Sequence, residues 1–484
     1  MRLQSTAPPL LASLLLAGTA LAQAGTGKVP ITTSSEEARQ LYVQGRDLVE
    51  KLRAADAYPV FEKAVAKDPG FALGYLGLAN AAPTNQTFFS ALKQAVALAG
   101  KVSDGERLMI LGLDAGVNSN PEGQRKMYTE LVEKFPNDER AATLLGNFYF
   151  AQQKYPLAIQ YLSRAAEIAP NFTQAYNQLG YAYRFEAKYP EAERAFKKYI
   201  EVLPGDPNPY DSYAEFLMKM GRFDESIASY RKALEVDPTF IASLVGIAND
   251  QMFQGKGTEA RKTLGQLTAV ARNDGERRQA LFWTAQSYVI EGRYAEAVKA
   301  VQEERAIAVK SGDFGAQSGD AQFIGNIELK AGKPDAAAAS FAEAVTLMGK
   351  AAVPAEVKEA NKRNSLFNTA RVAIAKGDLK GARAQAAEYQ KLVEVRKIPF
   401  EMWQLHELNG MIAIAAKDYE LALVELGRST DQNPRVLYLT AVALQGKGDL
   451  ARARAAAQAV TDFNALDPRY AFVRPEAKRM LVGS

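Results

Sequence analysis

The sequence of 484 residues contains no cysteine and only one histidine, His406. Without cysteine, the chain cannot form disulfides, thiolate metal sites, a cysteine nucleophile or a lipid-modified cysteine anchor. A single imidazole cannot build a multi-histidine metal site, and a serine–histidine pair would need carboxylates from distant segments. We therefore expect no metal site, no cofactor and no catalytic residue, and hence no enzymatic activity.

An excess of either charge sign is also missing. The chain carries 59 basic and 55 acidic side chains, which gives a formal net charge of +4. Both signs alternate along segments with helical patterning, as in residues 191–198. A nucleic-acid-binding surface would instead show a clustered basic stripe, so we expect no nucleic-acid partner.

Long apolar runs are absent except near the N-terminus. Arg2 precedes the apolar run of residues 10–16, and a small-residue cleavage pattern follows at Ala20-Leu21-Ala22. The run is shorter than the ~20 residues that a membrane-spanning helix needs, and the arrangement is typical of a secretory signal peptide. We interpret residues 1–22 as a signal peptide cleaved after Ala22. The mature chain is expected in the bacterial periplasm, without a transmembrane segment.

A repeated pattern occupies residues 140–240. Its closing prolines, Pro170, Pro204 and Pro238, are spaced 34 residues apart. The clearest copy reads Tyr176-x2-Leu179-Gly180-x2-Tyr183, then Ala192-x3-Phe196, then Pro204. A fixed period of this length indicates one supersecondary unit that is stacked on copies of itself.

Each unit of this pattern predicts two helices that face each other. Tyr176 and Tyr183 fall on one face of a first helix, and Phe196 falls on the facing side of a second. Gly180 is small where the two helices would cross closely, and Pro204 ends the second helix. One pair cannot bury its apolar face alone, so neighbouring pairs must complete the core.

The pattern resembles that of the tetratricopeptide repeat family. The resemblance implies an all-α fold, a right-handed superhelical solenoid of antiparallel helix pairs. It also implies that the first helix of each pair lines a concave surface, where the ligands of the family are extended peptides or helices. Weaker copies of the pattern continue on both sides of residues 140–240, so we predict about twelve helix pairs.

The first half of the chain is assigned to regular repeats. Residues 23–36 are polar and are interpreted as a flexible lead that ends in a helix cap. Residues 37–274 are assigned to repeats of 34 residues, which are sharpest over 139–240. A loop is expected after Pro83, because this proline interrupts the second copy.

The second half is assigned to longer and more divergent repeats, over residues 275–466. Their marker is a tight turn followed three residues later by alanine, as in Gly292-Arg-Tyr294-x2-Ala297. The segment 311–319 contains three glycines and is interpreted as a flexible joint. Residues 467–484 are expected to form a C-terminal tail.

Eight residues of the three sharp repeats are candidates for the ligand groove, because they lie on first helices and are not used by the packing pattern. They are Asn147, Phe150, Asn177, Tyr181, Arg184, Asp211, Glu215 and Met218. Asparagines there could hydrogen-bond an extended backbone, and the apolar side chains could form pockets. A family mode that holds a C-terminal carboxylate is not expected, because acidic residues stand where basic ones belong.

These observations predict a non-enzymatic scaffold or adaptor of the periplasm that binds a protein or peptide in its concave groove. Two alternatives stay open. One is a structural accessory of an envelope assembly, secretion or polysaccharide-export machine, in association with a membrane complex. The other is a glycan-binding protein, or an enzyme, with a site near Trp403 and His406. The identity of the partner and the oligomeric state are not predicted.

Overall fold

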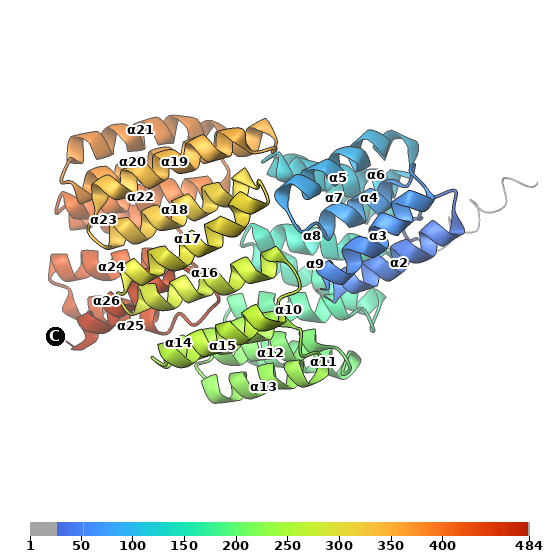
Figure 1. Ribbon diagram of the computed structural model, residues 1–484, viewed down its shortest axis with the longest axis horizontal. Helices are drawn as coiled ribbons and strands as arrows, with labels where there is room; N and C mark the ends of the chain where they lie inside the picture. The colour runs from blue at the N-terminus through green and yellow to red at the C-terminus, as the bar shows by residue number, and fades with distance from the viewer. Residues whose placement is uncertain (1–26, 52, 483–484) are drawn as a thin grey trace, which may run out of the picture.

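The computed structural model describes residues 27–51 and 53–482, which form 25 α-helices and no strand (Figure 1). In the first half the helices are α2 (Glu36–Glu50), α3 (Ala54–Lys67), α4 (Ala72–Asn80), α5 (Asn85–Leu98), α6 (Asp104–Val117), α7 (Pro121–Lys134), α8 (Glu139–Ala151), α9 (Tyr155–Ile168), α10 (Thr173–Phe185), α11 (Tyr189–Val202), α12 (Pro207–Lys219), α13 (Phe223–Val236), α14 (Ile241–Phe253) and α15 (Gly257–Val270). In the second half they are α16 (Asp274–Ile290), α17 (Tyr294–Lys310), α18 (Phe314–Lys330), α19 (Pro334–Lys350), α20 (Ala355–Ala375), α21 (Leu379–Arg396), α22 (Pro399–Ala415), α23 (Tyr419–Leu426), α24 (Pro434–Lys447), α25 (Leu450–Thr461) and α26 (Tyr470–Val482).

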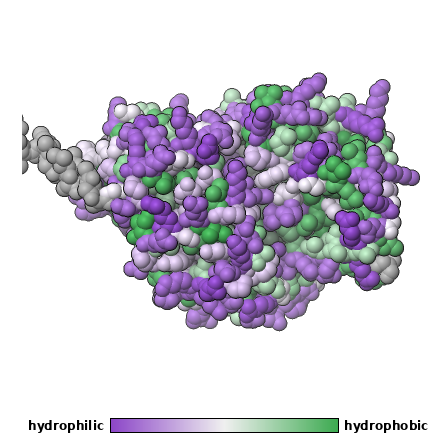
Figure 2. All heavy atoms as spheres, turned by 180° about the vertical axis from the view of Figure 1, so that it is seen from behind, coloured by the Kyte–Doolittle hydropathy of each residue, from purple (hydrophilic) through white to green (hydrophobic). Residues whose placement is uncertain are grey.

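The helices from α2 to α25 form twelve consecutive pairs, in which each helix packs on the next one and each pair on the next pair. The predicted all-α solenoid of helix pairs is therefore confirmed. Figure 1 shows the N-terminal pairs on one side, the pairs after α16 on the other, and α10 to α15 joining the two sides. Polar side chains cover most of the face seen in Figure 2, with smaller apolar patches between them.

Glycines allow the paired helices to approach each other closely. A Cβ atom at Gly180 of α10 would lie 2.6 Å from the ring of Phe196 on α11, and one at Gly112 would lie 2.2 Å from Tyr128. Phe196 is fully buried, so the ring occupies the space that a larger residue would need. The pattern predicted this small-against-large contact at Gly180 and Phe196.

The turn-plus-alanine markers of the longer repeats also correspond to turns between paired helices. The residues that open them have positive φ angles: Gly292, Gly332, Gly377, Lys417 and Gly448. The alanines that follow are buried in the pair contacts: Ala297, Ala337, Ala382, Ala422 and Ala453. Glycine is favoured at such φ angles because it has no Cβ atom.

The loop predicted after Pro83 is wrong beyond Thr84, because α5 begins at Asn85. Thr84 and Thr87 cap this helix reciprocally. The Oγ1 atom of Thr84 accepts from the N–H of Thr87, and the Oγ1 atom of Thr87 accepts from the N–H of Thr84, both at 3.2 Å. Polar turn-forming residues at a helix start were therefore mistaken for a loop.

The flexible joint predicted over residues 311–319 is also wrong. The helix α17 ends at Lys310, and α18 begins at Phe314 after a tight turn. Asp313 caps α18 by accepting from the N–H of Ala316 at 2.9 Å. Within the helix, the buried Ser318 donates to the carbonyl of Ala344 at 2.7 Å. The small residues of this segment pack helices together rather than loosening the chain.

The described part of the predicted flexible lead lies against the solenoid. The N–H of Val29 donates to Asp138 at 2.9 Å, and the N–H of Thr32 donates to Glu106 at 2.7 Å. The N–H of Ser34 donates to Asp68 at 2.9 Å. These bonds to three carboxylates hold residues 28–34 in place, and sequence periodicity gives no sign of them. Residues 1–26, with the predicted signal peptide, lie outside the described residues.

The predicted helix cap at the end of the lead is present, because Ser35 caps α2 by accepting from the N–H of Ala38 at 3.2 Å. The first two residues of α2, Glu36 and Glu37, place acidic side chains at the positive end of the helix dipole. Among the helices of residues 27–51 and 53–482, none combines the length and apolarity needed to cross a membrane.

The predicted C-terminal tail is instead a docked helix, α26, whose start Tyr470 is fully buried. The hydroxyl of Tyr470 donates to Asn249 Oδ1 on α14 at 3.1 Å, and its ring centre lies 4.7 Å from that of Phe253. In Figure 1, α26 lies beside α24 and α25 near α16, and it packs on α16, α24 and α25. The end of the chain therefore returns to the middle of the solenoid.

Two further contacts join pairs that are distant in the sequence. Arg272 Nη1 lies 3.3 Å from Asp56 Oδ1, across 216 positions. The hydroxyl of Thr430 donates to Gln153 Oε1 at 2.8 Å, across 277 positions. The solenoid is therefore wound tightly enough for separate turns to touch.

Candidate functional site

A cavity of about 160 Å³, here called the N-terminal cavity, lies between the first helices of the first five pairs. It is lined by Tyr42, Arg46, Val49, Glu50, Phe61, Leu76, Gly77, Asn80, Met109, Arg140, Thr143, Leu144, Asn147 and Gln174. Apart from Phe61 these residues come from α2, α4, α6, α8 and α10. Its lining combines apolar and polar side chains, as in a site for a chain segment with both kinds of group.

Arg140 links the two ends of this cavity. Its Nε atom donates to Glu50 Oε1 at 2.8 Å, and its Nη1 atom donates to Glu139 Oε1 at 2.6 Å. Its guanidinium lies 5.1 Å from the ring centre of Phe172. Burial lowers the pKa of Arg140, but the hydrogen bond with Glu50 and the charges of the neighbouring carboxylates together outweigh this and hold the pKa above its ordinary value. The arginine is therefore charged and already paired.

Two polar atoms at the N-terminal cavity have no hydrogen-bond partner among the described residues. They are Nε of Arg46, a donor, and Oδ1 of Asn147, an acceptor, and both are buried. On the next first helix, Oδ1 of Asn177 is likewise buried and without a partner. A buried polar atom left unsatisfied costs roughly 1–3 kcal/mol, so these atoms favour an additional molecule that supplies the missing bonds.

The candidate residues Phe150 and Tyr181 are engaged in aromatic contacts within the fold. The ring of Phe150 lies edge-on to Tyr155 at 5.4 Å and to Phe185 at 5.5 Å. The ring of Tyr181 lies edge-on to Phe196 at 5.2 Å. Burial raises the pKa of Tyr181 well above its ordinary value. Both side chains therefore contribute mainly to packing between neighbouring pairs.

The four other candidates lie on α10 and α12, and three of them, Arg184, Asp211 and Met218, are buried. Arg184 lies 3.7 Å from Glu215, and Asp211 accepts from Ser243 Oγ at 2.7 Å. Burial, and then the charge of Glu215, raise the pKa of Asp211. Met218 belongs to the largest apolar core. The structure therefore does not bring the eight candidates together in one open groove.

The segment between α25 and α26 covers the end of α12. Nζ of Lys219 lies 5.2 Å from the ring centre of Phe463. A Cβ atom at Gly221 would lie 3.7 Å from Asn464 Nδ2. The segment between α25 and α26 thus packs against the end of α12 and the turn that follows it.

Asp250 of α14 is a buried carboxylate without a hydrogen-bond partner on either oxygen among the described residues. Burial, followed by the charge of Asp224, raises its pKa to about 8. The folded state therefore keeps the proton at a pH where the unfolded chain, with a pKa of about 3.9, has lost it. This difference lowers the free energy of unfolding as the pH rises from about 4 to 8, by at most about 1.4 kcal/mol per pH unit.

We expect the substitution Asp250→Asn to remove this loss, because the amide cannot ionise. At pH 8 the variant should exceed the wild type in free energy of unfolding by more than about 1 kcal/mol, and near pH 4 the two should be similar. Urea unfolding at several pH values measures the difference. Asp335→Asn is the control, since that side chain is 91% exposed. An unchanged pH dependence in Asp250→Asn would contradict the expectation.

His406 and Trp403 of α22 each make one hydrogen bond, to α23 or to the turn after it. A hydrogen bond of 2.8 Å joins His406 Nδ1 and Glu425 Oε2, and the histidine side chain is 20% exposed. The carbonyl of Trp403 accepts from Ser429 Oγ at 3.0 Å. Within residues 27–51 and 53–482, no group of three or more histidine and acidic side chains is placed to hold a metal ion.

A second cavity, of about 280 Å³, lies between α18, α20, α24 and the start of α26 and is here called the C-terminal cavity. It is lined by Asn326, Leu329, Lys330, Arg371, Arg435, Tyr438, Leu439, Arg469, Phe472 and Val473. Sequence reasoning missed it. Arginine and lysine are common on exposed helix faces, so nothing in the sequence distinguishes these four cations from surface residues.

Comparisons with known proteins agree with the repeat architecture. Two family models described as Tetratricopeptide repeat match residues 139–204 and residues 217–282. No curated protein matches the sequence significantly.

Among solved structures, a crystal structure of MamA protein is 21% identical over 34% of this chain and 91% of its own, with a TM-score of 0.29. A structure of MamA residues 41 to the end, from Desulfovibrio magneticus RS-1, is 15% identical over 35% of this chain and 96% of its own, with a TM-score of 0.30. Structural similarity over so small a part of the chain does not indicate a function.

Proposed function

Because this chain is a tetratricopeptide-repeat protein, a scaffold for protein–protein interaction, we propose that it binds an extended segment of a partner protein in the N-terminal cavity. The role requires no catalysis by the chain itself. The partner segment would bind to the inner face of α2, α4, α6, α8 and α10. It would supply backbone polar groups and an apolar side chain.

One observation carries this proposal: the N-terminal cavity holds a buried acceptor, Asn147 Oδ1, and a buried donor, Arg46 Nε, that both lack a hydrogen-bond partner, although Arg46 Nε lies 3.8 Å from Glu50 Oε1 in an ion pair. A peptide backbone offers the two complementary groups, a carbonyl for the donor and an N–H for the acceptor. Apolar wall residues such as Leu76, Met109 and Leu144 would receive a side chain of the same segment. A rigid helical lining lowers the cost of ordering the site.

Of the eight candidate groove residues, we retain Asn147 as a direct ligand contact in the cavity, and Asn177 of α10, which does not line the cavity, as a contact for a segment that extends beyond it. Phe150, Tyr181, Arg184, Asp211, Glu215 and Met218 are proposed to act indirectly, by fixing the curvature of the pairs next to the site. The sequence of residues 1–22 supports export, so we propose the periplasm as the compartment. A component of an envelope assembly or export machine is compatible with this site as the partner.

The test uses peptides selected by display on the chain from Gln23 onward, with dissociation constants measured by calorimetry. We expect Asn147→Ala to weaken binding about tenfold, which corresponds to the loss of about 1.4 kcal/mol. The matched control is Asn171→Ala, because Asn171 is exposed and lies outside the cavity. If both variants bind the selected peptides as tightly as the wild type, the partner does not bind in this cavity.

A further inference from the structure

The four cations that line the C-terminal cavity differ in their counter-ions. Arg435 pairs with Glu407, Arg469 pairs with Asp467 at 2.5 Å, and Lys330 pairs with Glu476. None of these three acidic residues lines the cavity itself. The wall therefore presents cations toward the empty space, with their carboxylates placed behind them.

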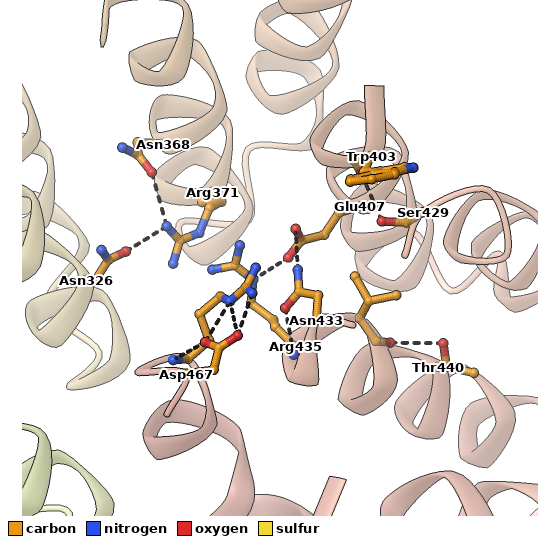
Figure 3. Close-up of polar contacts among 12 residues, drawn as sticks. Asn326, Asn368, Arg371, Trp403, Glu407, Ser429, Asn433, Arg435, Thr440 and Asp467 are labelled. Carbon is orange, nitrogen blue, oxygen red and sulfur yellow. Dashed lines mark hydrogen bonds and ion pairs between the residues drawn. The ribbon is translucent and has the colours of Figure 1, made fainter. Parts of the chain in front are cut away.

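Arg371 of α20 has no such counter-ion. Its Nη1 atom donates to the amide oxygens of Asn326 at 2.8 Å and Asn368 at 3.1 Å, which hold the guanidinium in place but carry no charge (Figure 3). Among the described residues, no aspartate or glutamate oxygen lies within 4.0 Å of it. Arg371 is thus a fixed, half-buried cation without an ion-pair partner of its own, and the charge of Glu407, which pairs with Arg435, offsets it only in part.

Arg371 also lies near a second cation. The guanidinium carbons of Arg371 and Arg435 are both 5.6 Å from the ring centre of Phe367. Burial and the charge of Arg435 lower the pKa of Arg371 to about 9. The charge of Glu407 opposes this shift, but two cations around one partly buried space still favour the entry of a second anion between them.

The rest of the wall is apolar or aromatic, with Leu329, Tyr438, Leu439, Phe472 and Val473. An inorganic ion would leave this surface in contact with water. The volume of about 280 Å³ is near the lower end of small-molecule sites, about 300–1,000 Å³, so the cavity has room for one small molecule. Arg469 is 39% exposed, which leaves this side of the cavity open to solvent.

We propose that the C-terminal cavity binds a small organic anion, with its carboxylate or phosphate between Arg371 and Arg435 and its apolar part on Leu439, Phe472 and Val473. Guanidinium groups bind both oxyanions through paired hydrogen bonds, and their planar fork suits either geometry. The site is separate from the N-terminal cavity and does not depend on the function proposed for it.

The cavity also depends on the end of the chain, because Arg469 immediately precedes α26 while Phe472 and Val473 belong to it. A ligand in the cavity would contact α18, α20, α24 and α26 at once. Its binding therefore stabilises the docked position of α26 and, through Tyr470, the contact with α14.

The test measures binding of benzoate, phenyl phosphate, benzyl alcohol and inorganic phosphate to the full chain by calorimetry, with thermal unfolding as a second readout. We expect benzoate or phenyl phosphate to bind and to raise the unfolding temperature. Benzyl alcohol, which has the ring without the charge, should bind at least about tenfold more weakly. The acid that binds more tightly identifies the preferred oxyanion, and binding of only one acid also supports the site.

The matched variants are Arg371→Met and Arg452→Met, which remove the same charge inside and outside the cavity. Arg452 lies on α25, is 71% exposed and pairs with Asp449 at 3.5 Å. Arg371→Met should weaken binding of the anion by at least about tenfold, while Arg452→Met should leave it unchanged. If Arg371→Met does not fold, the comparison of benzoate with benzyl alcohol on the wild type still tests the proposal.

Three results would overturn the proposal. The first is that the chain binds benzoate and benzyl alcohol with equal affinity and does not prefer phenyl phosphate. The second is that neither acid binds at millimolar concentration. The third is that a folded Arg371→Met variant binds the anions as tightly as the wild type. Binding of inorganic phosphate as tightly as phenyl phosphate would overturn the assignment of the apolar wall.

Discussion

Replacement of Tyr470 by alanine is expected to lower the free energy of unfolding by about 3–5 kcal/mol and to release α26 from the solenoid. The side chain is fully buried in the largest apolar core, against Phe253, and its hydroxyl donates to Asn249 Oδ1. Removal of the ring opens a cavity and also leaves the amide oxygen of Asn249 without its donor.

Urea unfolding followed by circular dichroism measures the loss, and amide hydrogen exchange over residues 470–482 reports the release of the helix. Val482→Ala serves as the control on the same helix, because Val482 is 88% exposed and should change stability by less than about 0.5 kcal/mol. If the amides of α26 exchange in the Tyr470→Ala variant at the same rates as in the wild type, other contacts hold the helix.

The substitution Gly246→Ala is expected to destabilise the fold by about 1–3 kcal/mol or more, although alanine is the better helix former. A Cβ atom at this position in α14 would lie 2.1 Å from Cζ of Tyr230 on α13. Tyr230 is fully buried, so its ring has no free space into which it can move. The helices must therefore separate to accept the methyl group.

Gly265→Ala provides a control of opposite sign. Gly265 lies inside α15, and a Cβ atom there would meet nothing within 4 Å. This variant should be more stable than the wild type by roughly 0.5–1 kcal/mol, because glycine weakens a helix interior. Thermal and urea unfolding of the two variants should shift in opposite directions. A shift in the same direction would mean that helix propensity, and not the contact with Tyr230, controls position 246.

The sequence predicted the pairs because their contacts are local. Gly180 meets Phe196, which is sixteen residues away, and the spacing of such small and large residues repeats along the chain. The positive-φ turns at Gly292 and Gly377 follow from the same local rules, even where the repeats become longer. The start of α5 was missed because two threonines cap it, without the acidic or amide residue that usually marks a capping box.

The candidate site was less predictable because periodicity identifies the inner face of a helix but not what covers it. Asn147 lies at an open cavity, whereas Met218, three residues beyond Glu215 on α12, lies in the core. The covering residues, such as Phe463, come from a segment without repeat markers. The sequence also does not reveal that Arg371 has no ion-pair partner, because this depends on how α20 and α24 pack together.

The contacts between Arg272 and Asp56 and between Thr430 and Gln153 change how the chain can come apart. In a solenoid whose units touch only their neighbours, the terminal units fray first and unfolding spreads along the array. Here the first pair is joined to the connection between the seventh and eighth pairs, and the last helix is joined to the middle of the solenoid. Unfolding of α3 or of α26 therefore breaks contacts with pairs that are distant in the sequence, which couples the ends of the array to its middle. Because these fastening contacts are so distant in sequence, they also increase the contact order and delay the final step of folding until synthesis is complete.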